Sequence, residues 1–255
     1  MSKKVAFTLL LLLAVFAILG PLLHSPTDIH LALKNTPPGS LFWLGSDDLG
    51  RDLFARLAYG TAISLSIGLL AALIDLVIGA LYGAIAGPTL MRIADLISAV
   101  PTLLKVILLT VLLGPGYKTI LIALALTGWI PMARIVRSQV LSLRSQEFIL
   151  GARAIGVGPT RLLFRYYLPN AIGPILATLT LTIPSAIFTE AYLSFLGLGL
   201  QPPLPSLGTL ISDGLSALRY YPWRLFFPAA TLTLAMLSLH LLGNTLRDDL
   251  DPRLR

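Results

Sequence analysis

Long apolar runs dominate this chain and are separated by short clusters of charged and turn-forming residues. A helix needs about 20 mostly apolar residues to cross a hydrocarbon layer about 30 Å thick. The third run ends at Gly114-Pro115-Gly116, a sequence typical of a turn. The pattern predicts an all-α polytopic membrane protein with six transmembrane helices, in residues 5–23, between 56 and 92, and in 96–113, 119–137, 170–197 and 224–247.

The first run has an alternative interpretation, because a basic start followed by an apolar segment is also typical of a cleaved signal peptide. This run is long for a signal peptide, and no small-x-small cleavage site follows it. We therefore expect it to be retained as a membrane anchor.

Composition supports a membrane location. Hydrophobic residues make up 56% of the 255 positions and charged residues only 12%, whereas soluble domains carry about 25% charged residues. The net charge of +7 would suit a nucleic-acid surface, but the basic residues punctuate apolar runs and form no polar face. Cysteine is absent, which excludes disulfides and thiolate metal sites. We expect a lipid environment and no nucleic acid.

The distribution of lysine and arginine predicts the orientation, because cytoplasmic loops carry the excess. With six spans, 12 of the 19 basic residues lie on the side of both termini, six lie opposite, and Lys105 lies within the third span. Both termini are therefore expected in the cytoplasm.

Two segments on the opposite side are long, residues 24–56 and 198–222. Each holds a proline-rich cluster that disfavours regular helix, which predicts packed irregular structure. We interpret them as a cap or docking surface, with plain connection as the alternative. The expected organisation is an anchor and outer loop in 1–56, a transmembrane domain in 57–246 and a cytoplasmic tail in 247–255.

The cytoplasmic segment of about 139–169 predicts a short helix, a sharp turn and a second helix. Phe148, Ala152 and Ile155 share one face of the first helix and offer an apolar stripe for burial. Gly156 begins a Gly-Val-Gly-Pro break.

The second helix is expected to be capped by Thr160 and to continue into the next span, which Leu168-Pro169 opens. Such a rigid lever can pass motion from a cytoplasmic partner into the membrane.

The residues of this segment resemble the "EAA" signature of permease subunits of binding-protein-dependent ABC importers. The residues that carry this resemblance are Leu150-Gly151-Ala152, Gly156 and Leu168-Pro169. Other stretches are similar to the C-type permeases of dipeptide, oligopeptide and nickel transporters, namely Leu44-Gly45-Ser46-Asp47-Asp48-Leu49-Gly50-Arg51-Asp52, Leu193-Ser194-Phe195-Leu196-Gly197-Leu198-Gly199 and Leu246-Arg247-Asp248-Asp249-Leu250-Asp251-Pro252-Arg253.

The resemblance implies a type I ABC importer transmembrane fold in the inner membrane of a prokaryote. It implies a heterodimer with a homologous permease, two ABC ATPase subunits that bind ATP and Mg, and an extracytoplasmic substrate-binding protein. This chain contains no G-x-x-x-x-G-K-[ST] phosphate loop, so we expect a non-catalytic subunit with no cofactor and no metal site of its own.

The resemblance also implies a coupling helix that sits on an ATPase. The signature's acidic first residue is Leu150 here, so Glu147 or apolar packing would replace that contact. Arg153 and Arg161 would meet an acidic ATPase residue or, alternatively, anionic headgroups. The residues expected to carry coupling are Glu147, Phe148, Gly151, Ala152, Arg153, Gly156 and Arg161.

Three charges fall inside predicted spans, where they are costly and need an explanation. Asp75, Lys105 and Glu190 are expected to line the pathway or to serve a structural role. For Glu190 we favour a structural hydrogen bond or an ion pair with Lys105 over binding of a substrate ammonium. The aspartates of 47–52 are interpreted as a turn and a helix cap and not as a cation site.

Other classes of protein fit less well. A secondary transporter or channel would be polytopic too, but it has no need of the two-helix cytoplasmic segment. An intramembrane protease would require a Gly-flanked serine with a histidine, or H-E-x-x-H, and neither is present. Among substrates, peptides are favoured, and nickel or another small solute is the alternative.

Overall fold

The computed structural model describes residues 3–250, with side chains described for 4–245. Helices make up nearly all regular structure of these residues, and the extended chain forms a single isolated bridge, Ser46 to Asp52. The all-α prediction is confirmed. The helices are α1 (Lys3–Leu23), η1 (Leu31–Leu33), α2 (Leu53–Ile85), α3 (Pro88–Ala99), α4 (Thr102–Leu113), α5 (Tyr117–Ala125), α6 (Trp129–Leu143), α7 (Glu147–Ala154), α8 (Pro159–Leu162), the π-helical turn η2 (Leu163–Tyr167), α9 (Leu168–Asn170), α10 (Ile172–Phe195), α11 (Leu207–Ala217) and α12 (Trp223–Leu250).

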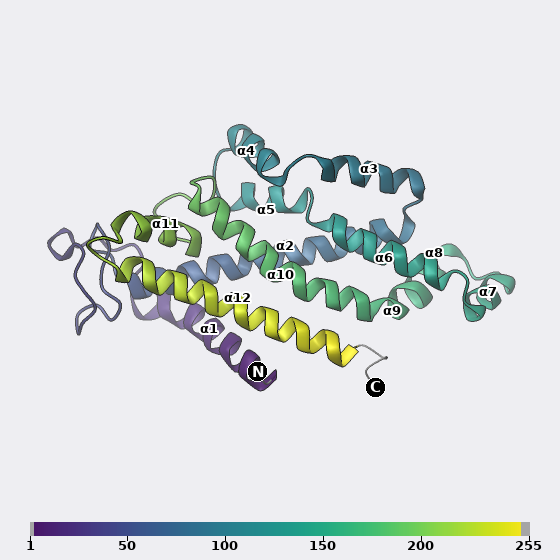
Figure 1. Cartoon of the computed structure of the whole chain (residues 1–255), viewed down its shortest axis with the longest axis horizontal. Coiled ribbons are helices and arrows are strands. Elements are labelled where there is room, and N and C mark those ends of the chain that lie inside the picture. The colour runs from purple at the N-terminus through teal and green to yellow at the C-terminus, as the bar shows by residue number, and fades with distance from the viewer. Residues whose placement is uncertain (1–2, 251–255) are drawn as a thin grey trace.

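The long helices α2, α6, α10 and α12 lie lengthwise beside one another, and α1 packs along α2 and α12 (Figure 1). In lipid, helices associate through close van der Waals contact, which small residues permit. A side chain at Gly83 of α2 would collide with the backbone of Ala133 in α6, and one at Gly68 would collide with Ile187 in α10. Glycines of α2 therefore bring α6 and α10 close enough to pack.

Four expected spans match the structure closely: α1, α2, α10 and the segment 223–245 of α12. The fourth expected span, drawn to end near Arg137, is the longer segment Tyr117–Leu143, in which a turn separates α5 from α6. Within residues 3–250, five segments are thus long and apolar enough to cross a membrane.

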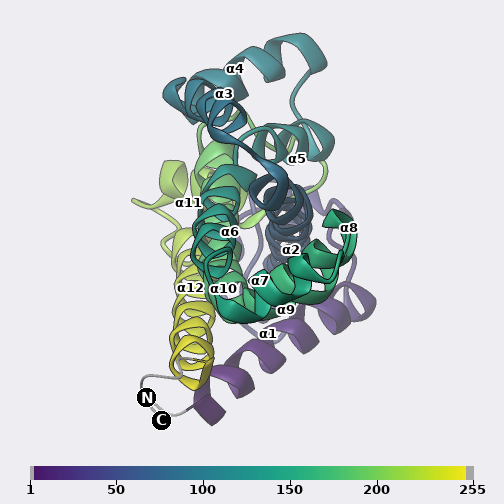
Figure 2. The same ribbon diagram turned by 90° about the vertical axis from the view of Figure 1, so that its right-hand side faces the viewer.

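The prediction of one continuous helix over 96–113 is wrong. Residues 88–113 form two helices, α3 and α4, bent by 76° at their junction. Pro101 disfavours helical backbone for Val100, whose ψ is 125°, because the proline ring crowds the preceding residue. Figure 2 shows α3 and α4 standing away from the bundle as an arm, and counting this bent pair as one span restores six.

The prediction of irregular structure holds for residues 24–52, which contain only η1, and is wrong for part of 198–222. There α11 begins at a capping box: Ser206 Oγ accepts from the Thr209 amide at 3.3 Å, and Thr209 Oγ1 accepts from the Ser206 amide at 2.8 Å. The proline cluster lies just before the helix, where it removes no helical hydrogen bond. Leu207 and Leu210 lie in one buried apolar cluster with Leu53 and Leu57 of α2.

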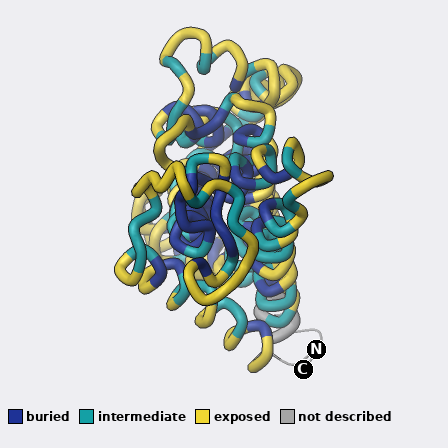
Figure 3. Tube along the Cα trace, turned by 90° about the vertical axis from the view of Figure 1, so that its left-hand side faces the viewer, coloured by how far each residue is buried: buried dark blue, intermediate teal, exposed yellow. Residues whose placement is uncertain are grey.

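We call residues 24–52 the cap. With α11, the cap closes one end of the bundle, while α7 and α8 lie at the other end (Figure 1). Seen from the cap end, buried chain lies at the centre and exposed chain forms the rim (Figure 3). No side chains are described for the predicted tail, 247–255, or for the motif Leu246–Arg253, so the contacts of its basic residues lie outside the described part.

Candidate coupling loop and intramembrane charges

Residues 144–171, which we call the α7–α9 loop, join α6 to α10. The first helix, α7, is two turns long and ends as predicted at Gly156, where φ is +81°. The Gly156 amide donates to the Arg153 carbonyl and the Val157 amide to the Ala152 carbonyl, both at 3.0 Å. This pair of bonds is a Schellman motif, which needs the left-handed conformation that glycine adopts without strain.

The apolar residues of α7 point in two directions. Ile149 and Ala152 are buried in a cluster with Val136 and Val140 of α6. The predicted stripe is wrong in two of its three members, because Phe148 is 47% exposed and Ile155 is 81% exposed. The loop folds back onto α6 through the neighbouring face, centred on Ile149. This leaves the other apolar residues in the open.

The second helical part begins two residues earlier than predicted. Gly158, not Thr160, is the N-cap residue of α8, and Pro159 occupies the first turn. Proline suits that position because its missing amide would have no helical partner. Then η2 and α9 lead into α10, as the prediction of a helix continuing into a span required.

The predicted coupling residues lie on or beside α7, apart from Arg161 on α8, which is exposed. At Gly151 and Gly156, an added Cβ would meet no atom within 4 Å. Glu147 occupies the first turn, where the negative carboxylate interacts favourably with the positive end of the helix dipole. Arg153 has a partner inside the chain, since its guanidinium donates to the Tyr167 hydroxyl at 2.8 Å. Their part in coupling stays a prediction.

Glu190 is fully buried in α10. Its carboxylate accepts hydrogen bonds from the Ser64 hydroxyl at 2.6 Å and from the Ser194 hydroxyl at 2.8 Å. Ser64 Oγ in turn accepts from the Leu207 amide at 3.2 Å, which ties α2, α10 and α11 together. The favoured hydrogen-bonded role agrees with this geometry, whereas the suggested pairing with Lys105 is wrong.

Asp75 and Lys105 line one cavity of about 460 Å³ between the bundle and the α3–α4 arm. Asp75 is only 2% exposed. Its Oδ1 has no hydrogen-bond partner in the described part of the chain. Lys105 Nζ donates to the Ile97 carbonyl at 3.2 Å.

Comparison with known proteins identifies the family. The inner membrane component of binding-protein-dependent transport systems matches residues 64–255. The chain belongs to this family. The permease is therefore a membrane component of an ABC importer and not its ATPase.

Relatives match the permease over nearly its full length. It is 50% identical to the oligopeptide transport system permease protein of Bacillus subtilis, over 100% of this chain and 87% of the relative. It is 47% identical to the dipeptide transport system permease protein of the same organism, over 97% of this chain and 80% of the relative.

A solved structure, the MetNI methionine ABC transporter in inward-facing conformations, matches with a TM-score of 0.61 at 16% identity, covering 77% of this chain and 96% of the other. An amino acid ABC transporter determined with histidines gives a TM-score of 0.59 at 18% identity, over 76% and 94%. These likenesses show the type I importer fold.

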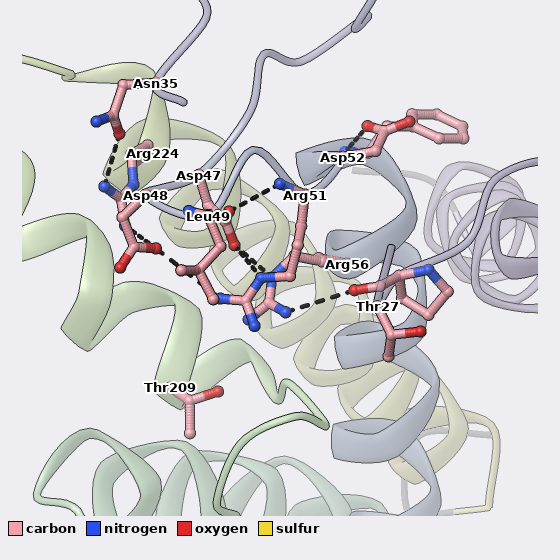
Figure 4. A network of polar contacts seen from close by, with 12 residues as sticks. Thr27, Asn35, Asp47, Asp48, Leu49, Arg51, Asp52, Arg56, Thr209 and Arg224 are labelled. Carbon is pink, nitrogen blue, oxygen red and sulfur yellow. Dashed lines mark hydrogen bonds and ion pairs between the residues drawn. The ribbon is translucent and has the colours of Figure 1, made fainter. Parts of the chain in front are cut away.

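The cap of the permease is held by buried ion pairs that the motif alone did not reveal (Figure 4). Asp47 Oδ2 lies 2.6 Å from Arg51 Nε and 3.2 Å from Arg56 Nε. Asp47 Oδ1 accepts from the amides of Leu49 and Arg51, each at 2.9 Å. The i,i+4 spacing of Asp47 and Arg51 is a signal that could have indicated the first pair.

A second set of contacts ties the cap to α12 and α2. Arg224 donates to Asn35 Oδ1 at 2.9 Å and to Asp48 Oδ1 at 3.3 Å. Asp52 caps α2, as predicted, by accepting from the Phe54 amide at 2.8 Å. His24 Nδ1 lies 2.9 Å from Asp52 Oδ2. Among the described residues, no three His, Asp or Glu side chains gather as a metal site would require.

Proposed function

We propose that the permease forms half of the translocation pathway of an ATP-driven importer of di- or oligopeptides in the cytoplasmic membrane of a prokaryote. Its partners are a homologous permease, in a heterodimer, two ATPase subunits that hold ATP and Mg, and an extracytoplasmic binding protein. The observation that carries the substrate class is the 50% and 47% identity, over nearly the whole chain, to permeases of oligopeptide and dipeptide systems.

The exposed side of α7 supports a docking role. Phe148, Leu150 and Ile155 expose 47%, 51% and 81% of their surface. Gly151 lies among them with open space above it. An exposed apolar patch next to a glycine allows another protein to pack closely against α7, because burial of apolar surface drives association. Leu150, where the family signature is acidic, makes this contact apolar in the present chain.

The orientation follows from the same assignment. If α7 meets an ATPase, the α7–α9 loop and both termini lie in the cytoplasm. The cap then lies outside, where a binding protein docks. The lysine and arginine bias of the sequence favours this arrangement.

The substrate is tested by deleting the gene and measuring uptake of labelled dipeptides, longer peptides and nickel ions. We expect peptide uptake to fall to background and to return when the wild-type gene is restored. Loss of nickel uptake with intact peptide uptake would contradict the peptide assignment and support the alternative substrate.

The coupling contact is tested by Gly151→Trp. The new side chain enters open space in this chain, so the permease should still fold, but a docked ATPase would collide with it. Gly39→Trp in the cap is the matched control, because its nearest neighbour to an added Cβ is 3.9 Å away. We expect the ATPase to co-purify with wild type and Gly39→Trp and to be lost from Gly151→Trp. Equal recovery from all three would refute the contact.

A further inference from the structure

The cavity between the bundle and the α3–α4 arm has the size and lining of a ligand site. Its volume of about 460 Å³ lies within the range of about 300–1,000 Å³ typical of small-ligand pockets. Its walls come from α2, α4, α6 and α10, and the turn between α5 and α6 closes one side. These are helices of the transmembrane domain, so a solute that crosses along them would pass this cavity.

On one wall lies Asp75, a buried carboxylate with an unpartnered oxygen. Its neighbour Gly128 also lines the cavity, and an added Cβ at Gly128 would collide with both carboxylate oxygens. Because glycine has no side chain, the Asp75 carboxylate can lie against the backbone of Gly128. An acidic group at membrane depth without a partner is costly, and such groups mark pathways of charged solutes.

The cavity lining also includes a row of hydroxyls from α10: Thr178, Thr182, Ser185 and Thr189. Three of these hydroxyls donate to the helix backbone, Thr178 to Pro174 at 2.8 Å, Thr182 to Thr178 at 3.0 Å and Thr189 to Ser185 at 2.8 Å. Because their protons are used in this way, their oxygens offer lone pairs to the cavity. Together with Asp75 they form a wall of acceptors, which suits a cation.

Two other residues of the lining are cations, Arg134 on α6 and Lys105 on α4. Arg134 is engaged by Asp95 at 2.7 Å and by Ser98 at 3.1 Å. Lys105 on α4 donates to a backbone carbonyl, and within residues 4–245 no carboxylate pairs with it. Its ammonium therefore keeps its charge available for an anion in the cavity.

We propose that this cavity is a transient binding site for a short zwitterionic peptide, with the α-ammonium at Asp75 and the α-carboxylate at Lys105. The inference rests on the proposed function, because it assumes that the solute is a peptide. The presence of both a carboxylate and cations in one lining favours a ligand with both charges over a metal ion or a sugar. It also gives each end of the peptide its own charged partner.

The test uses the complete transporter in proteoliposomes with its binding protein and a labelled dipeptide. Asp75→Asn and Lys105→Gln keep nearly the same volume and remove one charge each. We expect each to lower uptake by about tenfold or more, because a hydrogen bond to a charged group is lost. ATPase assembly and basal ATP hydrolysis should stay within about twofold of wild type. Arg92→Gln, on the same arm but exposed and outside the cavity lining, should transport normally.

A peptide amide distinguishes the two ends of the ligand. It lacks the carboxylate, so Lys105→Gln should reduce its uptake no further, whereas Asp75→Asn should still do so. Normal dipeptide uptake by both cavity variants would overturn the site and leave the peptide importer intact. Failure of Asp75→Asn to assemble with the second permease would also overturn it, since Asp75 would then be a subunit contact. Absence of peptide uptake by the wild type would instead refute the proposed function.

Discussion

The two ends of the molecule differ in how they satisfy unfavourable side chains. The cap pairs its buried charges, whereas α7 leaves apolar side chains exposed. In the cap, the buried carboxylate of Asp47 pairs with Arg51 and with Arg56 of α2, and backbone amides satisfy its remaining oxygen. On α7, apolar side chains are left in solvent although the helix has a buried face available. The buried charges of the cap find their partners within this chain, whereas the exposed apolar side chains of α7 do not.

This difference separates structural residues from residues that meet a partner. A buried ion pair is costly to break, because the group left behind stays charged and desolvated. An exposed apolar side chain contributes little to the fold that displays it. Substitutions in the cap should therefore change stability first, and substitutions on the outer face of α7 should change assembly first.

The largest effect is expected for Asp47→Ala, which leaves Arg51 and Arg56 buried without their shared carboxylate. We expect the free energy of unfolding to fall by about 3–5 kcal/mol, measured by thermal or denaturant unfolding in detergent. Asp28→Ala in the cap is the control, because Asp28 is exposed and a surface substitution changes stability by at most about 0.5 kcal/mol. Equal losses would show that the cap does not depend on buried charge.

Next come the two faces of α7. Ile149→Ala empties a fully buried position beside α6 and should cost about 2–5 kcal/mol of stability. Phe148→Ala should change stability by at most about 0.5 kcal/mol and should weaken recovery of the ATPase. A stability loss at Phe148 as large as that at Ile149 would contradict the division between an inner and an outer face.

A smaller effect is expected for Tyr167→Phe, which removes the hydroxyl that accepts from Arg153. One lost hydrogen bond should cost about 1 kcal/mol. If Arg153 only braces the α7–α9 loop, Arg153→Met should match Tyr167→Phe in both stability and ATPase recovery. A much greater loss of ATPase recovery in Arg153→Met would indicate an additional contact with the partner.

The smallest effect is expected for Gly151→Ala, since the new methyl group enters open space. Alanine favours a helix over glycine by about 1 kcal/mol, so unfolding should occur at the same or a slightly higher temperature. Gly208→Ala in α11 should instead lower the unfolding temperature, because its Cβ would collide with the backbone of Ala191. A similar response at both glycines would contradict the contrast between a packed end and an open one.

Much of the architecture could be predicted because the signals are local. The apolar runs placed the long helices, Asp52 was correctly expected to cap a helix, and Gly156 was correctly expected to end α7. The bend at Pro101 has a local cause too, but the apolar run on both sides of the proline concealed it. Composition likewise concealed α11, because the proline cluster lies before the helix and not within it.

The partners of side chains could not be predicted in the same way. Glu190 pairs with Ser64, which is 126 residues away. Phe148 and Ile155 share a stripe by spacing, but the loop buries Ile149 instead. Helical periodicity says which residues share a face; it does not say which face the rest of the chain covers.

By itself, the sequence determined that this chain is a helical membrane protein, because the length and polarity of each run decide whether a helix is stable in hydrocarbon. Its motifs also indicated the family. Only the tertiary structure decided that the cap charges neutralise one another, that the outer face of α7 stays open, and that Asp75 and Lys105 share a cavity. The cap pairs and the buried face of α7 join residues fairly close in the sequence, but only folding brings their side chains into contact; the cavity depends on segments far apart in the chain and on how the helices pack together.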